Sequence, residues 1–114
     1  MPTPQRGQLY WAHVPTEPSD RRRPVLIVSS DSRNALANDV MVVPITSNMR
    51  SAPTHVVIPA GFGGLPHRSA AKCEQLKTIQ KTCLHGEPLG LRVPETILRD
   101  VVAAVLRAMD VPGA

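Results

Sequence analysis

RPVLIVSS, DSRNALAND and VMVVPITS follow one another over residues 23–47 and decide the fold of this chain. Two runs rich in β-branched residues flank a polar link with turn-forming Asp, Ser and Asn, and this pattern predicts two strands. If the strands pair antiparallel across the link, the start of the first lies beside the end of the second. Arg23 would then share one rim of a sheet with Thr46 and Ser47, so a permanent cation would face two hydroxyl groups.

Short strands are also predicted on both sides of this stretch. Alternation over residues 8–14 predicts a first strand with Leu9 and Trp11 on its buried face. Pro44 lacks a ladder donor and is therefore expected at a bulge or at a sheet edge. Residues 15–22 and the glycine-rich segment 60–68 should form loops. Further strand material is expected at residues 54–59 and 69–80, followed by a helical turn at 81–84. Residues 86–91 should form a short turn or a last strand.

One helix is predicted, at the end of the chain over residues 94–110. Pro94 suits its first turn, Glu95 complements the helix dipole, and Pro112-Gly113 ends it. Its apolar residues recur at helical spacing and form one stripe: Ile97, Leu98, Val101, Val102, Val105, Leu106 and Met109. We expect a mainly β fold, a small barrel or sandwich capped by this helix. The chain should be one domain over residues 1–114, with residues 1–5 frayed.

The composition is that of a folded and moderately basic chain. Of its 114 residues 42% are hydrophobic, which supplies a core, and 13 basic against 9 acidic side chains give a net charge of +4. That charge favours an anionic partner such as nucleic acid. Two cysteines form no disulfide framework, the start carries no signal peptide, and no apolar run has the roughly 20 residues of a membrane span. We therefore expect a cytoplasmic protein with reduced thiols and no membrane association.

Motifs for metal binding and nucleophilic catalysis are missing from the sequence. The candidate metal ligands show none of the short spacings of a zinc site: His13, His55, His67, His85, Cys73 and Cys83. GxSxG, Walker and GxGxxG patterns are absent as well. We therefore expect no metal and no cofactor, and the rim with Arg23 and Thr46 remains as the candidate for chemistry.

Five segments between Arg6 and Leu84 follow in a characteristic order: RGQLYWA, RRRPVLIVSSDSRN, VVPITSN, THVVIPAGFGGLP and SAAKCEQLKTIQK. Together they resemble the MazF/PemK (Kid) family of toxin endoribonucleases of type II toxin–antitoxin systems. The resemblance implies a small SH3-like, partly open barrel with a C-terminal α-helix that works as a homodimer. It also implies sequence-selective cleavage of single-stranded RNA without a metal, and a MazE-like antitoxin as partner.

The same resemblance implies which residues act. The family's catalytic arginine precedes proline in its RPVLV-type strand, which is Arg23 here, and its catalytic threonine ends the PIT-type strand, which is Thr46. An acid–base partner would come from the short loop before Arg23, whose acids are Glu17 and Asp20. The RNA-binding positions implied are Arg21, Arg22, Ser47, Asn48, His55, Gln75 and Lys77.

Two other classes of protein stay open on the same barrel. A CcdB-like gyrase poison grips a protein through a C-terminal tail that contains tryptophan, whereas this chain ends MDVPGA. A non-catalytic RNA-binding barrel would use its basic surface to bind RNA and would not need the pair of Arg23 and Thr46. The combination of Arg23 with Thr46 favours the endoribonuclease, because a phosphate-gripping guanidinium and a neutral donor are what phosphodiester cleavage requires.

Overall fold

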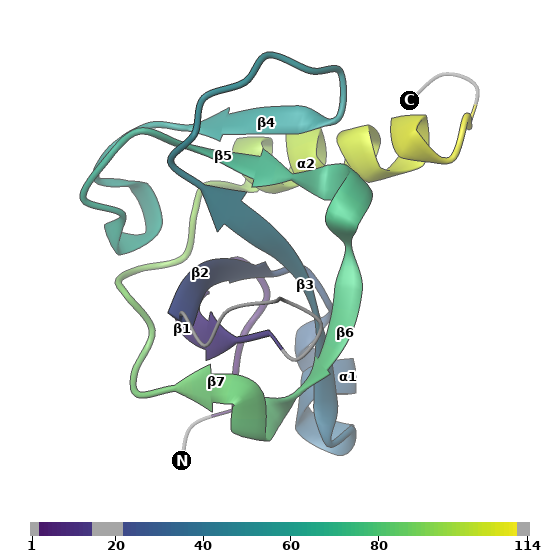
Figure 1. The fold of residues 1–114 in the computed structure, drawn as a ribbon. Helices are drawn as coiled ribbons and strands as arrows, with labels where there is room; N and C mark the ends of the chain where they lie inside the picture. Colours follow the sequence, from purple (N-terminus) through teal and green to yellow (C-terminus); the bar gives the residue numbers. More distant parts are fainter. Residues whose placement is uncertain (1–2, 15–21, 112–114) are drawn as a thin grey trace.

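A strongly curved antiparallel sheet forms the body of the computed structural model, which describes residues 3–14 and 22–111 (Figure 1). The strands follow the order β4-β5-β3-β2-β1-β7, and β6 also pairs with β3. β4 and β7 end this order as edges, so the barrel is partly open. The predominance of strands confirms the predicted mainly β class. The strands are β1 (Leu9–His13), β2 (Arg22–Ile27), β3 (Asp39–Thr46), β4 (His55–Ile58), β5 (Ser69–Lys72), β6 (Lys77–Gln80) and β7 (Leu84–His85).

The two strands of the central stretch pair antiparallel, as the sequence predicts. In the register of β2 and β3, Val25 lies opposite Pro44 and Ile27 opposite Val42. Two steps further along the same register, Arg23 faces Thr46 at the rim of the sheet. The pairing of these strands is therefore what brings the cation and the hydroxyl together.

Pro44 lies at an interruption within a central strand. On its second side, β3 pairs with β6 from Asp39 to Val42 and then with β5 at Ile45 and Thr46. The 3-10 turn η2 (Cys73–Gln75) separates β5 from β6, and Pro44 falls in the gap between the two ladders. The expected break in pairing is thus present inside the sheet and not at its edge.

The polar link between β2 and β3 contains a short helix, α1 (Asp31–Leu36), where only a turn was predicted. Ser30 caps it, since its hydroxyl accepts the backbone N–H of Arg33 at 3.3 Å. The side chain of the buried Asn34 donates to the carbonyl of Pro4 at 3.1 Å. This contact holds Pro4, also buried, against the helix. The expectation of a frayed start is therefore wrong from Pro4 onward.

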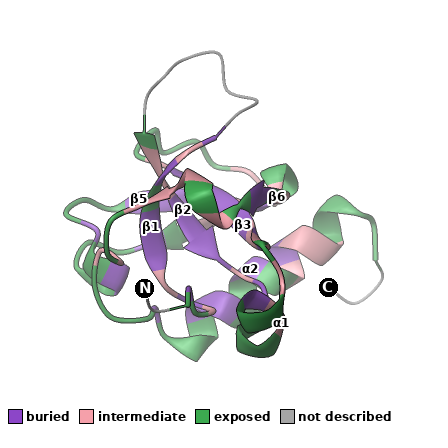
Figure 2. Cartoon of the chain, turned by 90° about the horizontal axis from the view of Figure 1, so that it is seen from below, coloured by how far each residue is buried: buried purple, intermediate pink, exposed green. Residues whose placement is uncertain are grey.

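The central strands are largely buried (Figure 2). Their side chains form two hydrophobic clusters on opposite faces. Leu9, Leu26 and Val43 belong to the cluster that also contains the inner face of the C-terminal helix. Tyr10 joins the second cluster, so the first strand is buried on both faces near its start. Trp11 was predicted to lie in the core, but its side chain is 43% exposed. It lies on the same face of β1 as the buried Leu9, at the point where this face reaches the rim of the sheet.

The predicted C-terminal helix is α2 (Glu95–Ala108), which begins directly after Pro94 and lies along β4 and β5 (Figure 1). Its apolar stripe does not all enter the core: Ile97, Leu98, Val101 and Ala104 are buried, but Val102 and Met109 are exposed. No helix among the described residues is long and apolar enough to cross a membrane.

The loops around these elements differ in detail from the sequence expectations. The glycine-rich segment carries a single 3-10 turn, η1 (Phe62–Gly64), and a further turn, η3 (Lys81–Cys83), confirms the helical turn expected there. The last strand is β7, and residues 86–91 contain bends and no strand, so of the two alternatives for this segment the strand is wrong. In η1 Gly63 has φ +64°, and a Cβ there would lie 2.3 Å from the side chain of Leu9, so this position requires glycine.

Candidate active site

Arg23 and Thr46 line one cavity of about 280 Å³ at the rim of the sheet. The start of β2 supplies the arginine, the end of β3 supplies the threonine, and β1 contributes the indole of Trp11. The segment between η1 and β5 forms another wall of the cavity. The full lining is Trp11, Arg22, Arg23, Pro24, Ile45, Thr46, Ser47, Leu65, Pro66, His67 and Ser69. We call this space the rim cavity.

The rim cavity suits an anion. Arg22 and Arg23 line it, and no carboxylate stands among the described residues of its wall. The hydroxyl oxygen of Thr46 accepts the backbone N–H of Asn48 at 3.1 Å, which leaves its own O–H to donate to a bound group. A guanidinium and a hydroxyl donor therefore face one space in which a phosphate can bind.

A second cavity of about 410 Å³ continues from the first, because Thr46 lines both. Its wall comes from the segment between β3 and β4, from β5 and from η2. The lining is Thr46, Asn48, Arg50, Ala52, Thr54, His55, Lys72, Glu74 and Gln75. We call it the loop cavity. Arg50 and Lys72 extend the positive charge of the rim cavity, so the two spaces form one basic groove.

His55 joins three segments of the loop cavity. Its Nε2 lies 3.1 Å from a carboxylate oxygen of Glu74, and its Nδ1 lies 3.0 Å from the carbonyl oxygen of Arg50. The hydroxyl of Thr54 donates to the same carboxylate at 2.8 Å. Both ring nitrogens are therefore engaged within the chain, and they hold the β3–β4 segment against η2.

Most of the site residues that the sequence indicates lie along this groove. Arg22, Arg23, Thr46 and Ser47 line the rim cavity, and Asn48, His55 and Gln75 line the loop cavity. Lys77 lines neither cavity, because it sits beyond η2 on β6 opposite Val42. Arg21, Glu17 and Asp20 lie outside the residues that the structure describes.

Among the lining residues with an aromatic or ionisable side chain, five were not indicated as site residues by the sequence: Trp11, Arg50, His67, Lys72 and Glu74. Lys72 and His55 lie opposite each other in the pairing of β4 with β5. The sequence predicts both strands and so allows them to pair, but it does not give the register that places Lys72 opposite His55. His67 follows a proline in a loop, where the sequence has no periodic pattern that could predict which side chains line a cavity.

The cysteines show no sign of reactivity or metal binding. Cys73 is buried, and burial raises the pKa of its thiol to about 12, so it stays protonated and unreactive. Cys83 is also a free thiol. Within the described part of the chain, no three side chains of the His, Cys, Asp or Glu type gather as a metal site would require.

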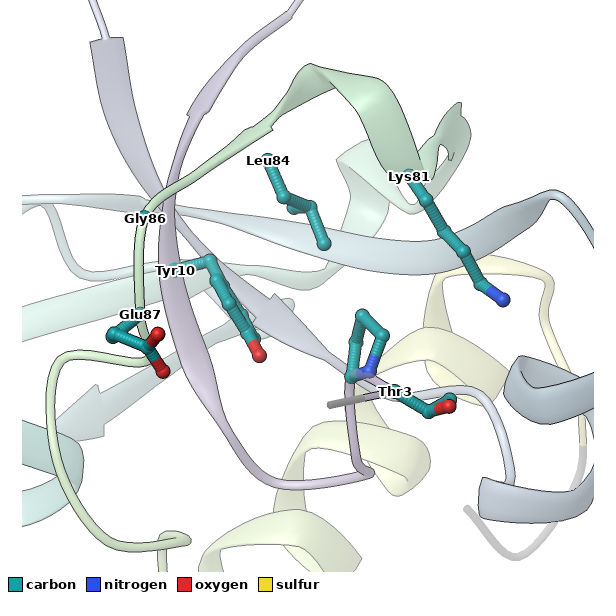
Figure 3. Close-up of a pocket in the computed structure, with 7 residues that line it drawn as sticks. Thr3, Tyr10, Lys81, Leu84, Gly86 and Glu87 are labelled. Carbon is teal, nitrogen blue, oxygen red and sulfur yellow. The ribbon is translucent and has the colours of Figure 1, made fainter. Parts of the chain in front are cut away.

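A separate cavity of about 150 Å³ lies on the other face of β1 (Figure 3). Tyr10, Lys81 and Glu87 line it, and it shares no lining residue with the groove. Tyr10 and Trp11 are consecutive on a strand and point to opposite faces, so the two spaces are divided by the sheet itself. Burial, and then the nearby Glu87 charge, raise the pKa of the Tyr10 hydroxyl.

The fold and the groove define the class: a small, partly open β-barrel with a C-terminal helix and a basic groove that contains an Arg–Thr pair. The chain belongs to the family described as PemK-like, MazF-like toxin of type II toxin-antitoxin system, which it matches over residues 5–109.

Three relatives illustrate the match. Endoribonuclease MazF6 of Mycobacterium tuberculosis is 35% identical over 112 residues, covering 92% of this chain and 96% of that protein. Endoribonuclease PemK of Escherichia coli is 33% identical over 107 residues, covering 86% and 76%. The solved structure of an endoribonuclease in complex with its cognate antitoxin, from a mycobacterial species, has a TM-score of 0.76 at 27% identity and covers 100% of both chains.

Proposed function

We propose that this protein is a toxin endoribonuclease that cleaves single-stranded RNA in a sequence-selective way without a metal ion. The observation that carries the proposal is the rim cavity, where Arg23 and Thr46 meet in a space with two arginines and no carboxylate among its described walls. The named relatives support the reaction, since they are endoribonucleases of similar length.

Cleavage without a metal requires the protein to stabilise charge at the scissile phosphate. The ribose 2′-oxygen attacks the adjacent phosphorus, and the resulting phosphorane carries two negative charges. The guanidinium of Arg23 can contact two of its oxygens through parallel N–H groups, and the Thr46 hydroxyl adds a neutral donor. Arg23 is a poor proton carrier, because arginine keeps its proton at any working pH.

The loop cavity supports binding of the nucleotides that flank the cleaved bond. Arg50 and Lys72 can contact phosphates, while Asn48 and Gln75 offer amides that can read base edges. An open groove of this kind admits a single strand whose bases are splayed out. His55 acts through its bonds to Glu74 and to the Arg50 carbonyl, and so keeps this wall in place.

Two protein partners fit the same proposal. The solved complex of a related endoribonuclease with its cognate antitoxin supports a MazE-like antitoxin that neutralises this chain. The half-exposed apolar side of α2, with Val102 and Met109, supports a homodimer, because such a stripe gains stability when a second copy covers it. An RNA substrate and free thiols are consistent with a cytoplasmic site of action.

The test is incubation of the protein with a long single-stranded RNA in EDTA, with the cut sites mapped. We expect a limited set of cuts that leave a 2′,3′-cyclic phosphate and a 5′-hydroxyl, and no cuts in the same RNA when it is annealed to a complement. Purified Arg23→Lys protein is the control for a contaminating nuclease. RNA that stays intact, or that is bound without being cut, would instead favour a gyrase poison or a passive RNA-binding barrel.

A further inference from the structure

We propose that His67 is the general base of this site and removes the proton from the attacking ribose 2′-hydroxyl. The inference rests on the proposed cleavage of RNA and names the missing proton carrier of that reaction. His67 lines the rim cavity together with Arg23 and Thr46, although it lies more than 20 residues beyond either in the sequence.

The backbone around His67 is held in position. Its carbonyl oxygen accepts the hydroxyl of Ser69 at 3.0 Å, and Ser69 is buried at the start of β5. On the other side, Pro66 restricts the backbone, and Leu65 is buried in the core. The exposed side chain therefore projects from an anchored segment into the cavity wall, a placement that a proton carrier needs.

Among the described side chains that line this cavity, His67 is the one that can readily accept and release a proton at neutral pH. The ionisable side chains of its described wall are Arg22, Arg23 and His67. Guanidinium groups do not give up a proton in proteins, whereas imidazole exchanges protons in the neutral range. The charged groups that share this wall with His67 are the two arginines on β2, and Arg68 is the next residue in the chain.

Hydrogen bonding distinguishes His67 from the other histidine of the groove. His55 has both ring nitrogens engaged by Glu74 and by the Arg50 carbonyl. The ring of His67 makes no hydrogen bond to any other described residue. One nitrogen is thus available to accept the substrate proton, and this difference is what assigns the role to His67.

The step balances without any further reagent. A neutral His67 ring nitrogen takes the 2′-hydroxyl proton while the 2′-oxygen forms a bond to phosphorus. The bond from phosphorus to the 5′-oxygen then breaks, and the leaving 5′-alkoxide takes a proton from solvent water. The products are a 2′,3′-cyclic phosphate and a 5′-hydroxyl, and His67 returns its extra proton to solvent.

The experiment measures single-turnover cleavage of a short RNA that carries a mapped cut site, across the neutral pH range, with RNA affinity measured separately. His67→Gln should cleave about 10²–10⁴-fold more slowly at neutral pH, the range for loss of a positioned base. Its affinity for the RNA should match that of the wild type. The wild-type rate should rise with pH and then level off, whereas the rate of His67→Gln should keep rising with hydroxide.

Added imidazole gives a readout that a structural role would not move. His67→Ala should recover part of its rate with free imidazole, and Arg23→Lys should recover none. His85→Gln is the matched control, since His85 on β7 lines neither cavity of the groove and its loss should leave cleavage unchanged.

Three outcomes would overturn the proposal: His67→Gln cleaving within a few-fold of wild type, its pH profile keeping the plateau, or its affinity falling as much as its rate. Each of these outcomes counts only if the wild-type protein cleaves and the Arg23→Lys variant cleaves much more slowly. If the wild type itself leaves every RNA intact, the proposed function fails and the assignment of His67 fails with it. The two failures are thus distinguishable.

Discussion

The rim cavity and the loop cavity share Thr46, and each has a histidine in its wall, yet the two spaces are built differently. In the loop cavity the imidazole of His55 is committed to Glu74 and to the Arg50 carbonyl. In the rim cavity His67 stands with two arginines and no described carboxylate. The residue type alone therefore does not set the role of a histidine in this groove. A neighbouring carboxylate makes one histidine a clamp, and the lack of one in the described wall leaves the other available for chemistry.

The support behind the two cavities differs in the same way. Arg23 and Thr46 come from adjacent, hydrogen-bonded strands with buried neighbours, so their backbones are fixed by the core. The β3–β4 segment contains Arg50 between two exposed residues, and it depends on side-chain contacts such as the His55 clamp for its position. We expect substitutions of Arg23, Thr46 and His67 to change the rate of cleavage, and substitutions in the loop cavity to change binding.

After His67, the largest expected effect is on the arginine of the rim cavity. Arg23→Lys keeps the charge but replaces a planar fork with a point contact, so the single-turnover rate should fall about 10²–10³-fold, as when one preorganised donor is lost. Thr46→Val should behave alike, and the double variant should be little worse if both act as a unit. Arg22→Ala, the control, should mainly weaken binding. A near wild-type rate for Arg23→Lys would place the chemistry elsewhere.

The next effect concerns the exposed indole of the rim cavity. Trp11 can stack on an unpaired base, so Trp11→Ala should weaken RNA binding by about 1–3 kcal/mol, the range for one stacked base. Trp11→Phe should retain most of the affinity. Phe62→Ala is a matched control, because Phe62 is 42% exposed, close to the 43% of Trp11, and lines neither cavity. Equal losses for Trp11→Ala and Phe62→Ala, by fluorescence anisotropy, would contradict a stacking role.

A smaller effect is expected from opening the clamp of the loop cavity. His55→Ala removes two contacts that hold the β3–β4 segment, so RNA affinity should drop about tenfold, equivalent to about one net hydrogen bond or two. The single-turnover rate at saturating protein should change little. Glu74→Gln should act through the same contact, and the double variant should show no additional loss. If His55→Ala lowered the cleavage rate but kept its RNA affinity, His55 would have a role in the reaction and not in binding.

The smallest effect lies outside both cavities, at Asp31. Its carboxylate accepts the Arg6 backbone N–H at 2.7 Å and pairs with Arg92 at 3.0 Å, and the bond from Arg6 is the main cause that lowers the pKa of Asp31. A lowered folded-state pKa gives stability that is present above the unfolded pKa and lost as acid protonates the group. Because Asp31 is exposed and water screens its charge, Asp31→Asn should lower the free energy of unfolding by no more than about 1 kcal/mol at neutral pH.

Urea denaturation at several pH values checks this last prediction. The gap between Asp31→Asn and wild type should start to close as the pH falls below the ordinary carboxylate pKa of about 3.9. It should vanish only below the lowered folded-state pKa of Asp31, where both side chains are neutral. RNA cleavage should be unchanged, because Asp31 lines neither cavity. A gap that persists in acid would mean that the charge of Asp31 is not what stabilises this end of the barrel.

Errors in the sequence expectations come from residues whose role depends on distant parts of the chain. The predicted polar link at 31–39 contains the helix α1, which two contacts stabilise. The Ser30 hydroxyl caps the helix, and the Asn34 side chain donates to the carbonyl of Pro4, 30 residues earlier in the chain. Trp11 was expected inside, since alternation gives the face of a side chain but not where that face ends. Lys77 lines neither cavity, because β6 begins beyond η2, and its contact with RNA stays a prediction.

The sequence by itself determined the strands of the central stretch, their antiparallel pairing and the meeting of Arg23 with Thr46. These follow from local patterns, since β-branched runs on either side of a polar link have one simple way to pair. Only the tertiary structure decided which other groups surround that pair. Trp11, His67 and Lys72 come from three separate segments, and their approach depends on the curvature and register of the whole sheet. Local patterns specify a strand and its faces, but the neighbours of a site are set by the packing of the complete barrel.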